Sequence, residues 1–166
     1  DASLLGTRRF LRERVAPLLE EIGNAWVAGK FEIRHEHFFS EVLEDVVRSL
    51  RAGLEPSGRG RPVVLATLPD EFHGLGLHIA ALAVAASGRK VRVLGPHLPV
   101  DEIVKAAEAL DASAVGLSIS IFGTGNDTSR SVAELREGLP PGIDLWAGGA
   151  GAAHLENLPT GVSVLS

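Results

Sequence analysis

The sequence predicts an α/β fold in which a group of helices precedes a parallel sheet. From residue 63 onward, short apolar runs typical of buried strands alternate with helical stretches. Strands that alternate with helices indicate a parallel sheet with helices on both faces. Residues 3–52 instead carry apolar side chains at helical spacing, and a Gly/Pro/Ser-rich stretch follows. We therefore expect a helical-bundle cap over 1–52, a linker over 53–62 and a Rossmann-like (flavodoxin-like) five-stranded domain over 63–166.

About three helices fit into the first region. An apolar series at helical spacing covers residues 4–22, and Pro17 within it predicts a kink or the start of a new helix. Gly23 and Gly29 indicate a helix end and a turn. A further helix is expected over residues 33–50, where apolar side chains again recur at helical spacing.

Five strands are expected in the second region, at residues 63–67, 91–94, 114–119, 143–146 and 162–165. Helices are expected between the first four of them, at residues 75–87, 100–110 and 128–137. Ligands of such sheets bind at the carboxyl ends of the strands, near the point where the strand order reverses. The loops that follow the first four strands are therefore the expected binding region.

Composition argues against several classes of function. The chain has no cysteine, so it has no disulfide, no thiolate nucleophile and no Cys-ligated metal. The net charge is −5, and the basic residues near the N-terminus stand among acidic ones, as on a solvated helix face, which argues against nucleic-acid binding. No apolar run could span a membrane and no signal peptide is present, so we expect a cytoplasmic protein. Because residue 1 is Asp, we expect a piece of a longer or processed chain.

A histidine stands in the loop after the first strand, two residues after a carboxylate. The loop contains neither a G-x-G-x-x-G pattern nor a Walker motif. A metal-ligating imidazole typically donates its other ring N–H to a carboxylate, and Glu71 is spaced to accept it from His73. Gly74 and Gly76 remove side chains that would hinder a large flat ligand. On this loop alone, a loop histidine beside an unpaired acidic residue is an equal alternative.

Two further strand ends carry motif residues. Ser118 and Ser120 lie at the end of the third strand, and Gly148 and Gly149 follow the fourth. Together with the histidine loop, residues 71–76, these positions resemble cobalamin-binding domains of the methionine-synthase type. Those domains carry D-x-H-x-x-G, a serine after the third strand and Gly-Gly after the fourth, at close to these spacings. The resemblance covers nearly the whole chain.

The resemblance implies a role for each motif residue. His73 would replace the dimethylbenzimidazole of the cofactor as the lower cobalt ligand, with Glu71 as its hydrogen-bonded partner. The displaced nucleotide tail would descend beside the sheet, where Ser118 would hydrogen-bond it. Gly148 and Gly149 would let the tail lie against the backbone.

The helical region contains a second pattern. Trp26 is separated by nine residues from the pair Glu36 and His37. A tryptophan ring can cover a ligand, and a carboxylate and an imidazole can hydrogen-bond a ribose or purine. A core tryptophan beside a solvated helix start is the alternative. The W-x9-E-H pattern resembles light-sensing adenosylcobalamin domains, the CarH and LitR type of photoreceptor repressor.

This second resemblance implies that Trp26 shields a 5′-deoxyadenosyl group that Glu36 and His37 help to hold. Light would break the cobalt–carbon bond, the cap would move, and the state of a homo-oligomer would change. DNA would be bound by a separate domain outside this chain, or regulation would pass through a protein partner. Val27 stands where some of these receptors have a second histidine. Their caps have four helices, so we expect the first to be missing here.

The sequence therefore predicts a sensory module without catalytic turnover. The first alternative is a corrinoid methyl carrier of a methyltransferase system, which would share His73. The departures Glu71, where that family usually has Asp, and Ser120, where it has leucine, count against it. The second alternative is an interaction module with a degenerate cobalamin site. His97, after the second strand, is a further candidate for the edge of the cofactor.

Overall fold

The computed structural model describes residues 6–30, 32–54, 57–121 and 126–165, and it confirms the α/β fold. Five parallel strands form one sheet in the order β2-β1-β3-β4-β5. The strands are β1 (Arg59–Ala66), β2 (Arg89–Gly95), β3 (Ala114–Ser118), β4 (Asp144–Gly148) and β5 (Val162–Leu165). The strand order reverses between β1 and β3, so the loops that follow these two strands lie side by side.

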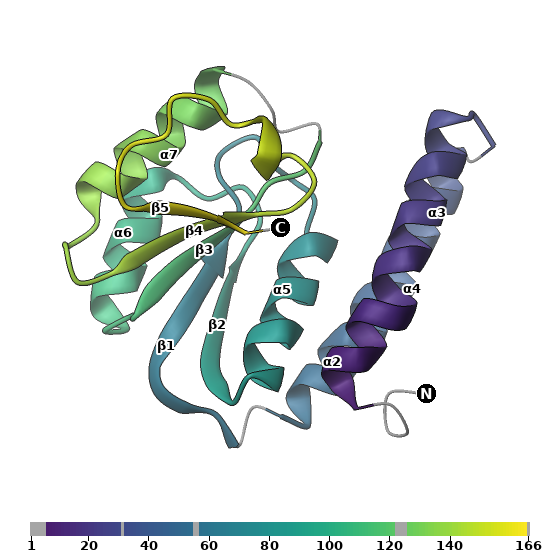
Figure 1. Cartoon of the computed structure of the whole chain (residues 1–166), viewed down its shortest axis with the longest axis horizontal. Helices are drawn as coiled ribbons and strands as arrows, with labels where there is room; N and C mark the ends of the chain where they lie inside the picture. Colours follow the sequence, from purple (N-terminus) through teal and green to yellow (C-terminus); the bar gives the residue numbers. More distant parts are fainter. Residues whose placement is uncertain (1–5, 31, 55–56, 122–125, 166) are drawn as a thin grey trace.

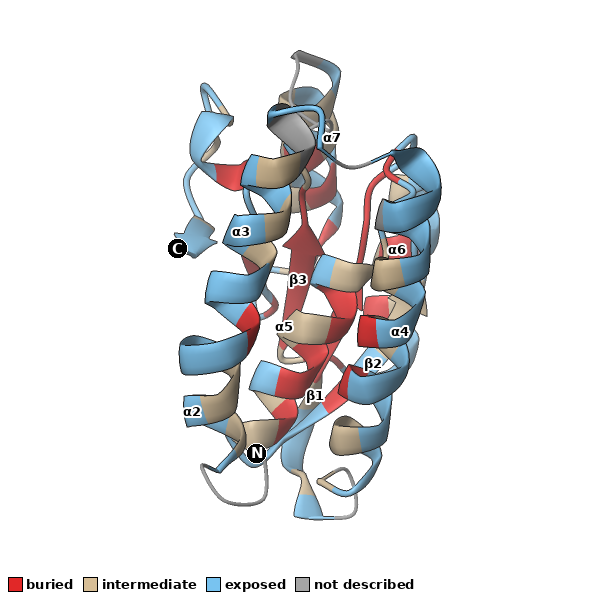
Figure 2. Ribbon diagram, turned by 90° about the vertical axis from the view of Figure 1, so that its right-hand side faces the viewer, coloured by how far each residue is buried: buried red, intermediate tan, exposed pale blue. Residues whose placement is uncertain are grey.

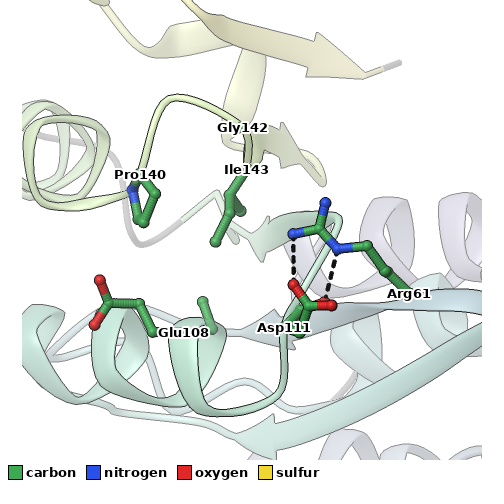
Figure 3. Close-up of a pocket in the computed structure, with 7 residues that line it drawn as sticks. Arg61, Glu108, Asp111, Pro140, Gly142 and Ile143 are labelled. Carbon is green, nitrogen blue, oxygen red and sulfur yellow. Dashed lines mark hydrogen bonds and ion pairs between the residues drawn. The ribbon is translucent and has the colours of Figure 1, made fainter.

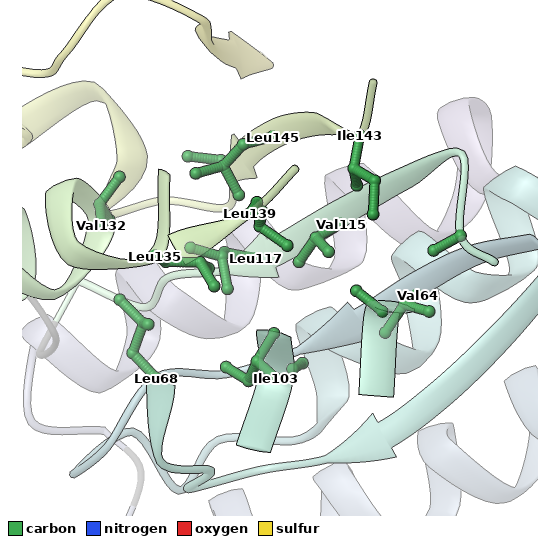
Figure 4. Packing of buried hydrophobic residues seen from close by; sticks show 14 of the residues in the cluster. Val64, Leu68, Ile103, Val115, Leu117, Val132, Leu135, Leu139, Ile143 and Leu145 are labelled. Carbon is green, nitrogen blue, oxygen red and sulfur yellow. The ribbon is translucent and has the colours of Figure 1, made fainter. Parts of the chain in front are cut away.

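Helices cover the two faces of the sheet unequally, as Figure 1 shows. One face is covered by α6 (Val100–Ala109) and α7 (Asn126–Gly138), and the other by α5 (Leu75–Ala86). The larger apolar cluster lies beneath α6 and α7, where side chains such as Ile103 and Leu135 pack against Val115 of β3 (Figure 4). Burial of these aliphatic side chains is the main source of stability for the sheet.

The N-terminal helices, residues 7–52, form a further layer outside α5 (Figure 1). The chain is continuously helical from α2 (Thr7–Phe10) through the π-helical turn η1 (Leu11–Val15) into α3 (Ala16–Val27). Pro17 lies one residue inside α3, directly after the π-helical turn, and the helix continues through it although proline donates no backbone N–H. Gly23 does not end α3, and the turn follows at Gly29, whose φ of 67° is left-handed.

The helix α4 (Ile33–Ala52) packs its apolar face on α5. Val47 and Leu43 of α4 and Leu82 of α5 are buried in this contact, together with Val15 from η1. Figure 2 shows α5 behind α3 and α4, with buried residues in red along it. No helix in the described ranges is both long and apolar enough to cross a membrane.

Most expected elements lie within two residues of their observed bounds, with one notable difference. Strand β1 begins at Arg59, four residues before the expected start, and includes part of the expected linker. Its first residues are exposed, but Arg59 pairs with Arg89 of β2, and Arg61 donates to the backbone oxygens of Asp111 and Ala112. These contacts extend a strand that has no apolar pattern at its start.

Candidate functional site

His73 and Glu71 lie together at the carboxyl edge of the sheet, in the loop between β1 and α5. The Nδ1 atom of His73 is 2.6 Å from Oε1 of Glu71, and the backbone N–H of His73 donates to the same oxygen at 3.0 Å. The Glu71 residue is 6% exposed, whereas the His73 side chain is 51% exposed. A buried carboxylate thus orients a half-exposed imidazole, as the spacing predicted.

The electrostatics of this pair fix the position of the ring proton. Burial alone raises the pKa of Glu71, but hydrogen bonds from the Ser120 side chain and from His73 bring the pKa below its ordinary value of 4.5. Glu71 is therefore ionised at neutral pH and accepts the proton that Nδ1 of His73 carries. Nε2 then holds the lone pair, which is the form in which an imidazole ligates a metal.

Glu71 also joins the two loops at the point where the strand order reverses. Its second oxygen, Oε2, accepts the backbone N–H of Ser120 at 2.9 Å, across 49 residues of sequence. Its carbonyl oxygen accepts the hydroxyl of Thr67 at 2.6 Å. The loops after β1 and β3 are thus held together before any ligand binds.

Gly76 is required by a close approach of α5 to β3. A Cβ at this position would stand 2.6 Å from Oγ of Ser118, closer than real Cβ contacts allow. Ser118 is itself buried at the carboxyl end of β3. A Cβ at Gly74 would stand 3.1 Å from Oε1 of Glu44 in α4. The structure gives these two glycines neighbours within the chain, and the expectation that they leave room for a ligand stays a prediction.

Gly148 and Gly149 lie where β4 leaves the sheet, and Gly148 pairs with Ser118. Gly149 has a φ of 99°, and a Cβ there would stand 2.5 Å from the carbonyl oxygen of Ile119. The backbone N–H of Ile119 in turn donates to Gly148. The absence of a side chain at Gly149 therefore lets the turn after β4 lie directly against the backbone that follows β3, and a role of these glycines toward a ligand stays a prediction.

The three cap residues occupy helix ends near the turn between α3 and α4. Trp26 lies in the last turn of α3, and Glu36 and His37 lie in the first turns of α4. The side chains of Trp26, Val27 and Glu36 are outside the described part of the structure, and that of His37 is exposed. Figures 1 and 2 show this turn at the same end of the molecule as the loop that carries His73. The backbone therefore places both predicted surfaces at one end.

His73 is a half-exposed imidazole oriented by a buried carboxylate, an arrangement suited to the axial ligand of a metal that a larger group carries. Among the described residues, no three His, Asp or Glu side chains gather as a metal site. A single oriented imidazole holds a metal well only when other ligands complete the coordination, as a macrocycle does. The pair of Glu71 and His73 thus fits a cobalt corrinoid that His73 would ligate.

A hollow at the opposite, amino-terminal edge of the sheet has no histidine among its lining residues (Figure 3). It lies beside an ion pair of 2.9 Å between Nη2 of Arg61 and Asp111. Its other lining residues are Ala107, Glu108, Pro140, Gly142 and Ile143. Because the strands begin at this edge, the hollow is separated from His73 by the length of the sheet.

A polar cluster between α4 and α5 was not predicted. Nη2 of Arg48 lies 2.9 Å from Glu44 and 2.8 Å from Nε2 of His78, which is 8% exposed. Since arginine only donates, His78 accepts at Nε2 and carries its proton on Nδ1, which is buried without a hydrogen-bond partner among the described residues. The charged residues at helical spacing, Glu44 and Arg48, were the only signal in the sequence.

Several known proteins are similar to this chain. A family model described as the B12 binding domain matches residues 61–162. The chain is 36% identical over 140 residues to the HTH-type transcriptional repressor CarH of Myxococcus xanthus, which covers 84% of this chain and 46% of the repressor. It is 25% identical over 156 residues to dimethylamine corrinoid protein 1 of Methanosarcina acetivorans, which covers 90% of this chain and 72% of that protein.

Among solved structures, the Methanosarcina barkeri monomethylamine corrinoid protein has a TM-score of 0.64 and 16% identity. The match covers 87% of this chain and 71% of that one, and at this identity it concerns the fold alone. The chain spans less than half the length of the repressor that it matches.

Proposed function

Because this chain belongs to the B12-binding domain family, we propose that it binds adenosylcobalamin and serves as the light-sensing module of a transcriptional regulator. The observation that carries the proposal is the pair of Glu71 and His73, whose 2.6 Å contact leaves the metal-binding lone pair on Nε2. His73 would hold the cobalt from below. Ser118, Gly148 and Gly149 would line the path of the nucleotide tail.

The upper face would be covered by the N-terminal helices, through Trp26, Glu36 and His37. A 5′-deoxyadenosyl group on cobalamin supplies a cobalt–carbon bond that light can break. Ile33 and Phe38, near His37, are exposed apolar side chains at the start of α4. Exposed apolar side chains of this kind could cover the upper face of a bound ligand. A cap that contacts the upper group only while that group is present would change position when it leaves.

The likeness to the repressor supports a regulatory role. An alignment of 140 residues is longer than residues 61–166, so it includes part of the N-terminal helices. DNA would be contacted through a separate domain or a protein partner, and a homo-oligomer would change its state with light. In this role the chain has no catalytic turnover.

The test is an absorption spectrum of the protein mixed with adenosylcobalamin in the dark, repeated after green light. We expect a bound, histidine-ligated spectrum that converts on illumination, and we expect His73→Ala to lose the histidine ligation. A bound spectrum that light does not change would contradict light sensing, and an unchanged His73→Ala spectrum would contradict the ligand assignment.

A methyl carrier is the second candidate, since the chain also matches dimethylamine corrinoid protein 1 over 90% of its length. Such a carrier would use the same His73. The two candidates differ at the upper face, so Trp26→Ala should weaken retention of adenosylcobalamin far more than that of methylcobalamin. Preferential binding of methylcobalamin by the wild type would favour the carrier.

A further inference from the structure

A stacked pair of exposed rings lies beside the proposed cobalt ligand. Phe72 stands between Glu71 and His73 in the chain, and its ring is 4.4 Å from that of His97, with 23° between the planes. Phe72 is 65% exposed, and the His97 side chain is 48% exposed. Two exposed rings in contact form an apolar patch at the carboxyl edge of the sheet, where ligands of this fold class bind.

The His97 ring is held in one orientation by contacts with residues 67–71, just after β1. Its backbone N–H donates to Oγ1 of Thr67 at 2.8 Å and to the carbonyl of Glu71 at 3.0 Å. Its Nδ1 accepts the backbone N–H of Asp70 at 2.8 Å. The proton of the neutral ring therefore lies on Nε2, on the other side of the ring.

The backbone of both loops is strained around this contact. Asp70 has a φ of 66° and His97 a φ of 56°, left-handed values that residues other than glycine rarely adopt. Strain of this kind persists where surrounding contacts enforce it, and it concentrates at ligand sites. Here it fixes an aromatic face and an N–H donor next to each other.

We infer that Phe72 and His97 form a second contact surface for the corrin, with Phe72 packing on its apolar part and His97 Nε2–H donating to a peripheral amide carbonyl. This inference rests on the proposed binding of cobalamin through His73. The rim of a corrin alternates apolar groups with amide side chains, and the pair offers a matching ring and donor. Phe72 is bonded to His73 itself, so a large ring held by His73 lies within reach.

The test is a titration of wild type, Phe72→Ala and His97→Asn with two probes, adenosylcobalamin and cobinamide. Cobinamide has the same corrin rim but no nucleotide tail. We expect each variant to raise the Kd about 3- to 10-fold for both probes, the size expected for one hydrogen bond or one apolar contact. Asparagine tolerates a left-handed backbone and can accept the Asp70 N–H, so His97→Asn should keep the loop folded.

Leu110→Ala is the matched control, because Leu110 is exposed at the end of α6, at the amino edge of the sheet. Its Kd should equal that of wild type. If Phe72→Ala and His97→Asn bind with the wild-type Kd, the inference is wrong but the proposed function stands. The same holds if the Kd changes only for adenosylcobalamin, or if a variant loses histidine ligation in its bound spectrum. A wild type that binds neither probe would overturn both the inference and the proposed function.

Discussion

At the scale of single residues, Glu71 does two things with one carboxylate. One oxygen accepts the backbone and ring N–H groups of His73, and the other accepts the backbone N–H of Ser120. Its charge therefore sets the tautomer of the imidazole and also holds the loops after β1 and β3 together. Removing the charge alone should weaken both effects without changing the size of the side chain.

We predict that Glu71→Gln raises the Kd for adenosylcobalamin about 10- to 100-fold, the usual cost of losing a carboxylate behind a ligating histidine. The Kd is measured by absorption titration in the dark. Glu108→Gln is the control, because Glu108 is an exposed carboxylate of α6 far from the site. An unchanged Kd for Glu71→Gln would mean that the orientation of His73 does not depend on this charge.

The same residues show how far sequence could predict the site. The contact of Glu71 with His73 spans two residues, so the spacing indicated it, although an unpaired acidic residue was an equal alternative on the loop alone. The contact of Glu71 with Ser120 depends on strand order, which no local pattern encodes. The stacking of Phe72 on His97 likewise joins loops that are distant in sequence. Local partners were predictable, whereas partners brought together by the sheet were not.

At the scale of elements, α5 and β3 approach closely because Gly76 has no side chain. We predict that Gly76→Ala lowers the free energy of unfolding by about 1–3 kcal/mol, the usual cost of overpacking. In a Ser118→Ala background the atom 2.6 Å away is absent, so the same change should cost much less. Urea unfolding of the two single variants and the double variant measures this difference. Equal costs in the wild-type and Ser118→Ala backgrounds would show that the contact with Ser118 does not cause the loss of stability.

The contact between α4 and α5 should depend on pH through His78. Burial, first, and the charge of Arg48, second, lower the pKa of His78. The charge of Glu44 partly offsets this lowering, and the charge of Arg51 adds to it. Because its folded pKa lies below the ordinary 6.5, the unfolded chain binds more protons as the pH falls below that value. The stability that neutral His78 contributes is complete above 6.5 and is lost below it.

We therefore predict that the free energy of unfolding falls between about pH 7 and pH 5, and that it falls less in His78→Gln. Glutamine can still accept from Arg48 but does not titrate. Thermal unfolding of the two proteins across this range provides the measurement. Identical pH profiles would show that His78 is not the responsible group.

Element boundaries were predicted best where burial sets them. The fully buried run of β3 gave its extent almost to the residue, whereas the exposed start of β1 was assigned to a linker. Residues 59–62 are charged, small or Pro, and they are a strand only because β2 and the Arg61 contacts hold them. Tertiary pairing thus overrides local composition at that end.

At the scale of the whole molecule, the layers are α6 and α7, the sheet, α5 and then the N-terminal helices. Among the described residues, the buried apolar contacts of the N-terminal helices outside their own layer are with α5. We therefore expect this layer to open at a lower free energy than the sheet.

Leu43→Ala tests this arrangement, because Leu43 is buried between α4 and α5. We predict a loss of about 2–5 kcal/mol in that contact, seen as faster amide hydrogen exchange over residues 7–52. Exchange in β1, β3 and β4 should change little. As a comparison, Val64→Ala, in the core beneath α6, should accelerate exchange throughout the sheet. Uniform acceleration by Leu43→Ala would mean that all layers unfold as one unit.

Helix α5 is apolar almost all the way round, with His78 as its one ionisable side chain. Most surface helices have one polar side that faces solvent, but α5 has apolar partners on two sides, the sheet and α4. Complete departure of the N-terminal helices would thus expose Leu82 and Ile79 to water, at a free-energy cost that grows with the exposed area. A second surface that covered this exposed face of α5 would stabilise the open form, so full opening would be coupled thermodynamically to association with such a surface. Small sliding of the helices along α5 avoids that cost.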